Sequence, residues 1–255
     1  MDLGLDGIHC VVTGASAGIG RGVAVALAAE GACVTILGRD REALEQTAAQ
    51  MEAAGGGPLA TITCDLAHRA GVDAGIDALA ALARPVQAIV NNAGGSRPYE
   101  MDAPPGEDAW DASFALNFTA ARRLTEHVLP AMRQARWGRI VTVTGSLALQ
   151  HMNAATPAKA AITSWSRGLA IQVARDGVTV NCVAPGRIKS AQMMQRLFPT
   201  EQSRKQEIER NVPMGRFGEP EEIAAAIVFL LSKRASYISG AMLPVDGSLI
   251  RLDLK

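Results

Sequence analysis

A glycine-rich turn is the first feature of this sequence that could hold a ligand. Gly14, Gly18 and Gly20 lie between an apolar run that predicts a strand and a stretch that predicts a helix, with Ser16 and Ile19 among them. Glycine lets the backbone approach a ligand closely, and the free N–H groups at the start of a helix attract anions. The context favours a pyrophosphate site. The spacing, Gly-x-x-x-Gly-x-Gly, differs from the commoner Gly-x-Gly-x-x-Gly, and a purely structural glycine turn is the alternative.

Polar or turn-forming residues follow three further predicted strands. They are Asp65 after the third strand, Asn91-Asn92-Ala93-Gly94 after the fourth, and Pro185-Gly186 after the sixth. Ligands of open α/β sheets bind at the carboxyl ends of the strands, so we expect these blocks to meet at one edge of a sheet. A purely structural reading would make them a helix cap, a turn asparagine and a loop stop.

Short β-branched runs alternate with longer stretches of helical period. The predicted strands are Ile8 to Thr13, Cys33 to Leu37, Ala60 to Cys64, Ala88 to Val90, Ile140 to Val143, Val178 to Val183 and Met242 to Val245; the predicted helices are Arg21 to Glu30, Arg41 to Ala54, Trp110 to Arg133, Ala158 to Ala174 and Pro220 to Leu231. This alternation indicates a parallel sheet with helices on both faces. We expect an α/β fold, a doubly wound, Rossmann-like three-layer sandwich, as a single domain over residues 1–255.

Composition narrows the classes of function. The 25 basic and 25 acidic residues give a net charge of 0, so no overall field favours nucleic acid or an anionic membrane. At 48% hydrophobic residues the chain is too apolar for disorder, and its longest apolar run, 223–231, is too short to span a bilayer. The four cysteines are scattered and are interpreted as reduced core thiols. We expect a cytoplasmic protein with no nucleic-acid or membrane partner and no metal.

Three ordered blocks, residues 13–20, 91–94 and 185–186, resemble the short-chain dehydrogenase/reductases over nearly the whole chain, in particular those similar to 3-oxoacyl-acyl-carrier-protein reductases. The resemblance implies a nicotinamide dinucleotide on the glycine turn, with Asp65 at the adenine and Asn91 over the cofactor. It implies that Pro185 and Gly186 border the nicotinamide, and it adds Leu66, Ala93 and Gly94 to the cofactor-binding residues. It also implies a homo-oligomer, a tetramer or dimer.

The end of the second predicted strand decides between the two nicotinamide dinucleotides. An acidic side chain there would accept hydrogen bonds from a ribose 2′-hydroxyl, whereas an arginine would pair with a 2′-phosphate. The sequence is Gly38-Arg39-Asp40, with Gly38 where NAD-preferring relatives usually carry the acid. Asp40 is more simply the cap of the following helix. We expect NADP(H) in preference to NAD(H).

The lysine of the family's catalytic site is present, but its tyrosine is not. Lys159 matches a lysine that raises the acidity of a tyrosine four residues earlier, and that earlier position holds Ala155. The resemblance implies that Lys159 still binds the cofactor's ribose. Thr156 and Pro157 are typical of an N-cap and a first helical turn, so we expect a helix to begin there.

Two further catalytic positions follow from the resemblance. Asn117 matches an asparagine that holds a water near the lysine. Ser146 is the nearest match for the family's serine, although Gly145 or Thr144 could stand in that register instead.

Loss of a general acid slows a reaction by about 10²–10⁴-fold. The sequence offers His151 and Tyr99 as substitute donors. A substrate that needs no strong acid, such as a conjugated alkene or iminium, would make a substitute unnecessary, and a chain that performs no chemistry would need no donor at all.

Residues 187–218 break the alternation and predict a substrate lid, or else a surface excursion. Met193, Met194, Leu197 and Phe198 would form an apolar wall, and Arg187, Lys189, Arg196 and Arg97 would meet an anionic group or be solvated. The first function expected is an NADP(H)-dependent oxidoreductase acting on a medium-sized, partly apolar carbonyl, alcohol or conjugated enone with a nonstandard proton donor. The second is a catalytically silent nucleotide-binding protein that acts as a sensor or partner subunit, and the third is a lyase or dehydratase.

Overall fold

Seven strands form one parallel sheet in the order β3-β2-β1-β4-β5-β6-β7 in a computed structural model, which describes residues 2–145 and 152–249. The strands are β1 (His9–Thr13), β2 (Cys33–Gly38), β3 (Ala60–Thr63), β4 (Ala88–Asn91), β5 (Gly138–Val143), β6 (Val178–Pro185) and β7 (Met242–Val245). The chain builds outward from β1 to β3 on one side, and from β4 to β7 on the other. The order in which strands are added to the sheet therefore reverses between β1 and β4. Open α/β sheets bind ligands at such a point.

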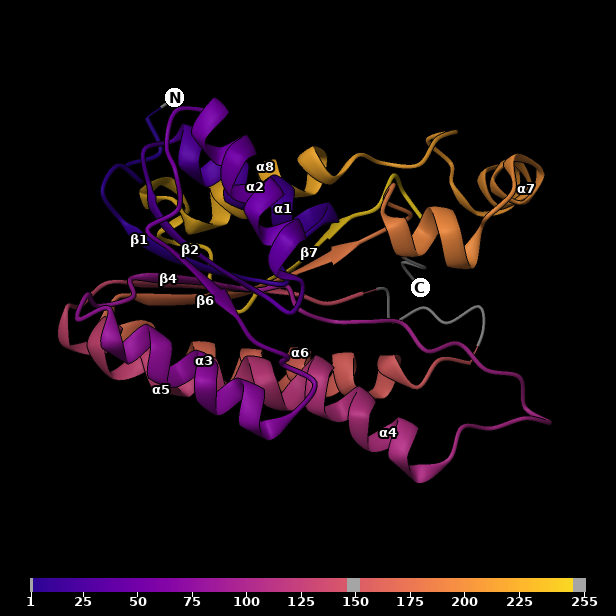
Figure 1. The fold of residues 1–255 in the computed structure, drawn as a ribbon, viewed down its shortest axis with the longest axis horizontal. Coiled ribbons are helices and arrows are strands. Elements are labelled where there is room, and N and C mark those ends of the chain that lie inside the picture. The colour runs from indigo at the N-terminus through magenta and orange to yellow at the C-terminus, as the bar shows by residue number, and fades with distance from the viewer. Residues whose placement is uncertain (1, 146–151, 250–255) are drawn as a thin grey trace.

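Helices cover both faces of this sheet (Figure 1). The main helices are α1 (Gly18–Ala29), α2 (Arg41–Ala53), α3 (Arg69–Ala81), α4 (Glu107–Phe114), α5 (Ala120–Gln134), α6 (Ala155–Val173), α7 (Glu201–Asn211) and α8 (Pro220–Leu231). Helices α1, α2 and α8 lie on one face, and α3, α5 and α6 lie on the other. Each face has its own buried apolar cluster, because alternate strand residues such as Val12 and Val11 point to opposite sides. The doubly wound α/β fold expected from the sequence is confirmed.

Most helix boundaries follow the predicted punctuation. Asp40 Oδ1 accepts a hydrogen bond from Ala43 N at 3.0 Å and caps α2, and Glu219 and Glu222 form a capping box at the start of α8. Gly31 and Gly177 adopt left-handed φ values of 75° and 73° after their helices. These residues act as expected because each satisfies or ends the backbone hydrogen bonding of a helix terminus.

The start of α6 differs from the prediction. The helix begins at Ala155, and Thr156 lies in its first turn instead of at the N-cap. Asn153 supplies the cap, since its Oδ1 accepts a hydrogen bond from Ala155 N at 2.9 Å. The prediction for Thr156 was wrong because a competing asparagine three residues earlier satisfies the free N–H group.

The helix predicted over residues 110–133 is a composite. It begins earlier, at Glu107, and a π-helical turn, η1 (Ala115–Thr119), separates α4 from α5. Single π turns are frequent at functional sites, and this one contains Asn117. A further helix, α3, was not predicted, because Gly71 and Gly75 weaken its helical signal.

All four cysteines are free thiols, as expected from the sequence. Burial raises the pKa of the Cys10 thiol to about 12.

Within residues 2–145 and 152–249, no helix has the length and hydropathy needed to cross a membrane.

Candidate functional site

The loops that follow β1 and β4 are tied together at the point where the strand order reverses. Thr13 Oγ1 accepts hydrogen bonds from the backbone N–H groups of Asn92 and Ala93, both at 3.0 Å. The side-chain amide of Asn92 donates to the carbonyl oxygens of Thr13 and Gly14, again at 3.0 Å. These hydrogen bonds fix the glycine turn against the Asn-Asn-Ala-Gly turn, so the two loops hold one position relative to each other.

The glycine turn forms a cradle that side chains would fill. Gly14 and Gly18 have positive φ values of 64° and 55°. A methyl group added at Gly20 would lie 2.2 Å from the carbonyl oxygen of Gly14, so only glycine permits this approach. The N-cap residue of α1, Ala17, makes no side-chain cap hydrogen bond, which leaves the first N–H groups of the helix available to an anion. This geometry fits the pyrophosphate of a dinucleotide.

The end of β2 presents an unobstructed cation. Gly38 is buried, and a methyl group added there would lie 3.2 Å from Ser16 Oγ in the glycine turn. Arg39 is exposed and has no hydrogen bond or ion pair with any residue in the part of the chain that the structure describes. Asp40 is occupied by capping α2. The guanidinium of Arg39 is thus the charged group available to a phosphate at this position.

The third and fourth strands place their predicted site residues differently. Asp65 lies directly after β3 with a half-exposed carboxylate, which accepts a hydrogen bond from Ala67 N at 3.0 Å, while Leu66 is buried in the core. Asn91 is buried on the α5 side of the sheet and donates to Thr125 Oγ1 at 2.9 Å. The side chain of Asn91 therefore positions β4 against α5. Ala93 and Gly94 belong to the loop that follows β4.

Gly186 follows β6 beside the C-terminal strand. Its N–H donates to Val245 O at 3.1 Å, and a methyl group added at Gly186 would lie 2.6 Å from Asp246 Cα. Pro185 and Gly186 thus end β6 in close contact with the turn after β7.

Lys159 and Asn117 meet next to Gly94. Asn117 is buried in the π turn; its Oδ1 accepts a hydrogen bond from Gly95 N at 3.0 Å, and its Nδ2 donates to Ser113 O at 2.9 Å. A methyl group added at Gly94 would lie 2.9 Å from Asn117 Oδ1 and 3.9 Å from Lys159 Nζ. Glycine at this position therefore allows both side chains to approach the loop after β4.

The Lys159 ammonium lies at the end of β5. Its Nζ donates to Thr144 O at 2.7 Å, and burial lowers the pKa of Lys159 to about 8. Ala155, one helical turn earlier, is only 2% exposed and has no group that can donate a proton. The predicted Ser146 and His151 lie outside the described residues.

The loop after β4 also pairs with the segment before α6. Pro98 and Asn153 form an antiparallel bridge, and Asn153 Oδ1 accepts a hydrogen bond from Arg97 N at 2.9 Å. The Tyr99 ring packs edge-on against Trp110, with ring centroids 6.0 Å apart. Arg97 and Arg196 both have exposed side chains.

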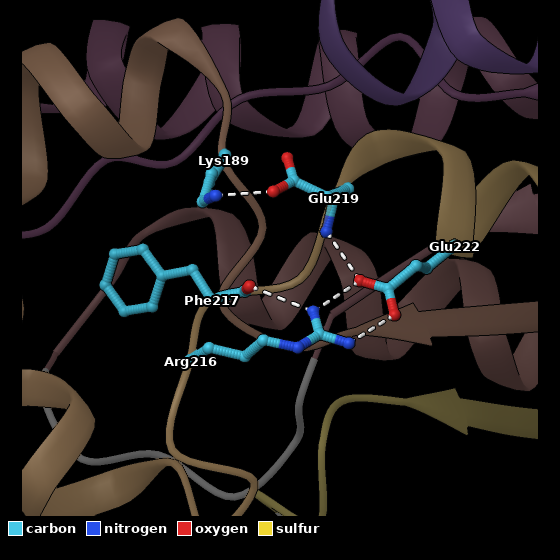
Figure 2. A network of polar contacts seen from close by, with 5 residues as sticks. All are labelled: Lys189, Arg216, Phe217, Glu219 and Glu222. Atoms are coloured by element: carbon cyan, nitrogen blue, oxygen red, sulfur yellow. Dashed lines mark hydrogen bonds and ion pairs between the residues drawn. The ribbon is translucent and has the colours of Figure 1, made fainter.

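The two ends of residues 187–218 are joined beside the first turn of α8. Gly218 O accepts a hydrogen bond from Lys189 N at 2.9 Å, and Gly218 N donates to Arg187 O at 2.8 Å. Figure 2 shows that Arg216 pairs with Glu222 and that Lys189 pairs with Glu219. The two terminal guanidinium nitrogens of Arg216 each donate to one carboxylate oxygen of Glu222 at 2.7 Å. The Arg216 hydrogen bonds lower the pKa of Glu222 to about 2. Ion pairs thus hold both ends of this segment to one helix terminus.

The same segment lines an open pocket of about 860 Å³. Its lining combines the apolar Met194, Ile208, Val212 and Phe217 with charged side chains that include Lys189, Arg204 and Arg216. The predicted Arg187 is bonded within the segment: its Nε lies 2.5 Å from Oε1 of Glu207, which is 8% exposed, and its guanidinium lies 5.7 Å from the Phe198 ring. Phe198 packs against Phe217 at 5.9 Å, while Met193 and Leu197 are partly buried.

Thr13, Asn92 and Ser190 have roles in the site that were not predicted from the sequence. Thr13 and Asn92 connect the two loops, as described above. Ser190 lies beside the glycine turn, since a methyl group added at Gly18 would lie 3.5 Å from Ser190 Cβ. Thr13 and Asn92 belong to two of the recognised blocks, which was a usable signal, whereas the position of Ser190 depends on how residues 187–190 return across the sheet edge.

The model of one protein family, described as enoyl-(acyl carrier protein) reductase, matches residues 14–249. The chain belongs to the short-chain dehydrogenase/reductase family. The family model is named for a reductase, which supports a general oxidoreductase role, and the glycine cradle fits a nicotinamide dinucleotide. The sequence-based recognition of the family is therefore confirmed.

Two curated relatives and one solved structure illustrate the similarity. The chain is 34% identical over 247 residues to 2-(S)-hydroxypropyl-CoM dehydrogenase 3 of Xanthobacter autotrophicus, covering 93% of this chain and 94% of that one. It is 35% identical over 251 residues to the 3-oxoacyl-[acyl-carrier-protein] reductase of Salmonella typhimurium, covering 97% and 99%. The structure of L-sorbose reductase from Gluconobacter frateurii matches with a TM-score of 0.91 and 29% identity over 98% of this chain and 99% of that one.

Proposed function

We propose that this protein is an NADP(H)-dependent oxidoreductase that acts on a carbonyl, alcohol or conjugated enone with a proton donor other than residue 155. The observation that carries the proposal is the convergence at Gly94, where the loop fixed to the glycine cradle meets the Lys159 ammonium. A cofactor-binding turn and a titratable group are thus adjacent at one edge of the sheet. The nicotinamide, when bound, supplies or accepts a hydride there.

This chain's own residues have distinct parts in the proposal. Gly14, Gly18 and Gly20 hold the pyrophosphate, Arg39 holds the 2′-phosphate, and Asn117 and Lys159 border the reacting end. The similar L-sorbose reductase, solved as a complex with NADPH and L-sorbose, supports both the cofactor and the type of substrate. The direct test is NADPH fluorescence on titration with protein, followed by NADPH oxidation with a panel of ketones and enones.

A second candidate function is a catalytically silent nucleotide-binding protein. Ala155 favours it, since a buried methyl group stands one turn before Lys159, where the family has an acid. NADPH binding without turnover of any substrate in the panel would support this second function, whereas turnover would exclude it.

Replacing Arg39 with glutamine should weaken NADPH binding by about 10- to 100-fold, because a charge-assisted hydrogen bond contributes about 1.5–3 kcal/mol. NADH, which has no 2′-phosphate, should bind the variant and the wild type equally. Fluorescence titration measures both affinities. Arg41→Gln is the matched control, because Arg41 is exposed at the start of α2 and pairs with Glu45. Equal loss of NADH and NADPH binding in Arg39→Gln would contradict a role in phosphate recognition.

We also propose that residues 187–218 form a substrate lid. The pocket of about 860 Å³ and the position of Ser190 beside Gly18 support this role, because they place a partly apolar pocket in a segment that lies next to the cofactor cradle. The ion pairs at the base of the segment would hold the lid in position.

Replacing Glu222 with glutamine should expose the lid to trypsin. The variant loses the Arg216 ion pair and weakens the capping box of α8, so cleavage after lysine and arginine within residues 187–218 should accelerate about two- to tenfold. Timed digestion with mass spectrometry locates the cuts. Glu221→Gln, on the same helical turn, should leave the rate unchanged. An unaltered cleavage pattern in Glu222→Gln would contradict the idea that this contact secures the lid.

A further inference from the structure

The side chain of Lys159 is directed toward the position that lacks an acid. Lys159 and Ala155 are four residues apart on α6, so they lie on one face of the helix. Helical side chains lean toward the N-terminus, which carries the lysine over the turn that contains Ala155. Ala155 is small and buried and has no proton to donate, whereas Lys159 on the same face has an ammonium.

The surroundings of Nζ leave protons available. An ammonium has three N–H donors, and one of them is used in the 2.7 Å bond to Thr144 O. Gly94 and Gly145 flank Nζ, and methyl groups added at either residue would lie 3.9 Å from it. Because both residues are glycines, neither has a side chain that would cover the ammonium.

Among the residues that the structure describes, the groups that face Lys159 are neutral. They are the Thr144 carbonyl and Gly145 at the end of β5, Gly94 in the loop after β4, and Asn117 in the π turn, which approaches Gly94. Among the described residues, Lys159 forms no ion pair with a carboxylate. Burial without a counter-charge disfavours the ammonium and lowers the pKa of Lys159 to about 8. A general acid works best when its pKa lies near the working pH, and burial brings the pKa of Lys159 closer to neutrality.

We propose that Lys159 is itself the proton donor of the reductase. This inference rests on the proposed function. A reduced nicotinamide bound at the cradle would supply a hydride to the carbonyl carbon of the substrate, and the π electrons of the C=O bond would move to the oxygen. That oxygen takes a proton from the Lys159 ammonium, which becomes a neutral amine and is reprotonated by water. The products are an alcohol and the oxidised nicotinamide.

The decisive comparison is between wild type, Lys159→Arg and the control Lys233→Arg. Arginine keeps the positive charge but does not release a proton in this pH range. Lys233 is exposed, and it follows α8 at the other end of the fold from the site. The probes are ethyl acetoacetate, L-sorbose and cyclohexanone, with NADPH oxidation followed from roughly pH 6 to pH 10 so that both forms of the acid are sampled.

We expect the wild-type kcat for reduction to be level at low pH and to fall above about pH 8, because the acid must be protonated. Lys159→Arg should lose at least about 100-fold in kcat and lack this break, while its NADPH affinity stays within about fivefold. Lys233→Arg should match the wild type. Lys159→Arg activity close to wild type would overturn the proposal and assign the proton to another group.

A titration measures Lys159 without any turnover. The chain has five lysines, so carbon-13 reductive methylation gives few NMR signals, and the one missing in Lys159→Arg belongs to Lys159. A midpoint near pH 8 supports the proposal, whereas titration in the ordinary lysine range overturns it. If wild type binds NADPH but reduces none of the probes, the proposed reductase function fails and the proton-donor role fails with it. Turnover that survives in Lys159→Arg overturns only the proton-donor role.

Discussion

Replacing Gly20 with alanine should abolish measurable NADPH binding. The added methyl group would lie 2.2 Å from the carbonyl oxygen of Gly14 and 2.5 Å from the Asn92 amide nitrogen, distances at which atoms overlap. Gly14 cannot retreat easily, because its carbonyl is bonded to Asn92 and an added methyl at Gly14 itself would meet Ala93 Cα at 2.9 Å. The turn must therefore open, and the pyrophosphate cradle is lost. Fluorescence titration should show at least about a 100-fold weaker Kd, equivalent to about 3 kcal/mol.

Gly22→Ala provides the matched control, since Gly22 lies in the same helix, α1, two residues later. A methyl group there would come no closer than 3.5 Å to the neighbouring Pro220, which is an ordinary contact. Alanine is also the better helix former by about 1 kcal/mol, so this variant should bind NADPH normally and unfold at a slightly higher temperature. Wild-type affinity in Gly20→Ala would refute the close approach of the glycine turn to the start of α1.

The sheet could be predicted because its strands are short, β-branched and apolar, and because turn residues separate them. The strand β1 and the cap of α2 by Asp40 followed from local patterns alone. Helix α3 could not be found in this way, since its glycines lower the helical signal. The structure explains Gly71: a methyl group added there would lie 1.9 Å from the Asp65 carbonyl oxygen. A tertiary contact selects glycine at this position, against local propensity.

The candidate site was predictable where a residue follows directly from a strand end. The blocks after β1, β4 and β6 could be placed at one edge because parallel strands share their direction. Contacts across the sheet edge were beyond local reasoning. Asn153 caps α6 in place of Thr156 because it also bonds to Arg97 N, in a segment some fifty residues away in sequence. The contact between Ser190 and Gly18 likewise required the full topology.

Replacing Lys159 with methionine should stabilise the ligand-free protein at pH 7 while removing its reductase activity. Burial lowers the pKa of Lys159 in the folded state from 10.5 to about 8, so the unfolded chain holds this proton more tightly. Below about pH 8 the folded protein therefore carries the whole unfavourable free energy of the buried ammonium, which is up to about 3 kcal/mol at 1.36 kcal/mol per pKa unit.

The sign of the pH dependence provides the test. As the pH rises from about 8 toward 10.5, the folded wild type releases the proton before the unfolded chain does, and wild-type stability rises toward that of the variant. Urea unfolding at pH 7 and pH 10 measures the difference, with Lys233→Met as the exposed control. The free energy of unfolding should be larger for Lys159→Met than for wild type at pH 7. If this difference is absent at pH 7, or if it widens as the pH rises, a buried ammonium without a counter-charge is contradicted. A gap that closes would mean that the fold tolerates a destabilising charge at the position where the reaction needs a proton.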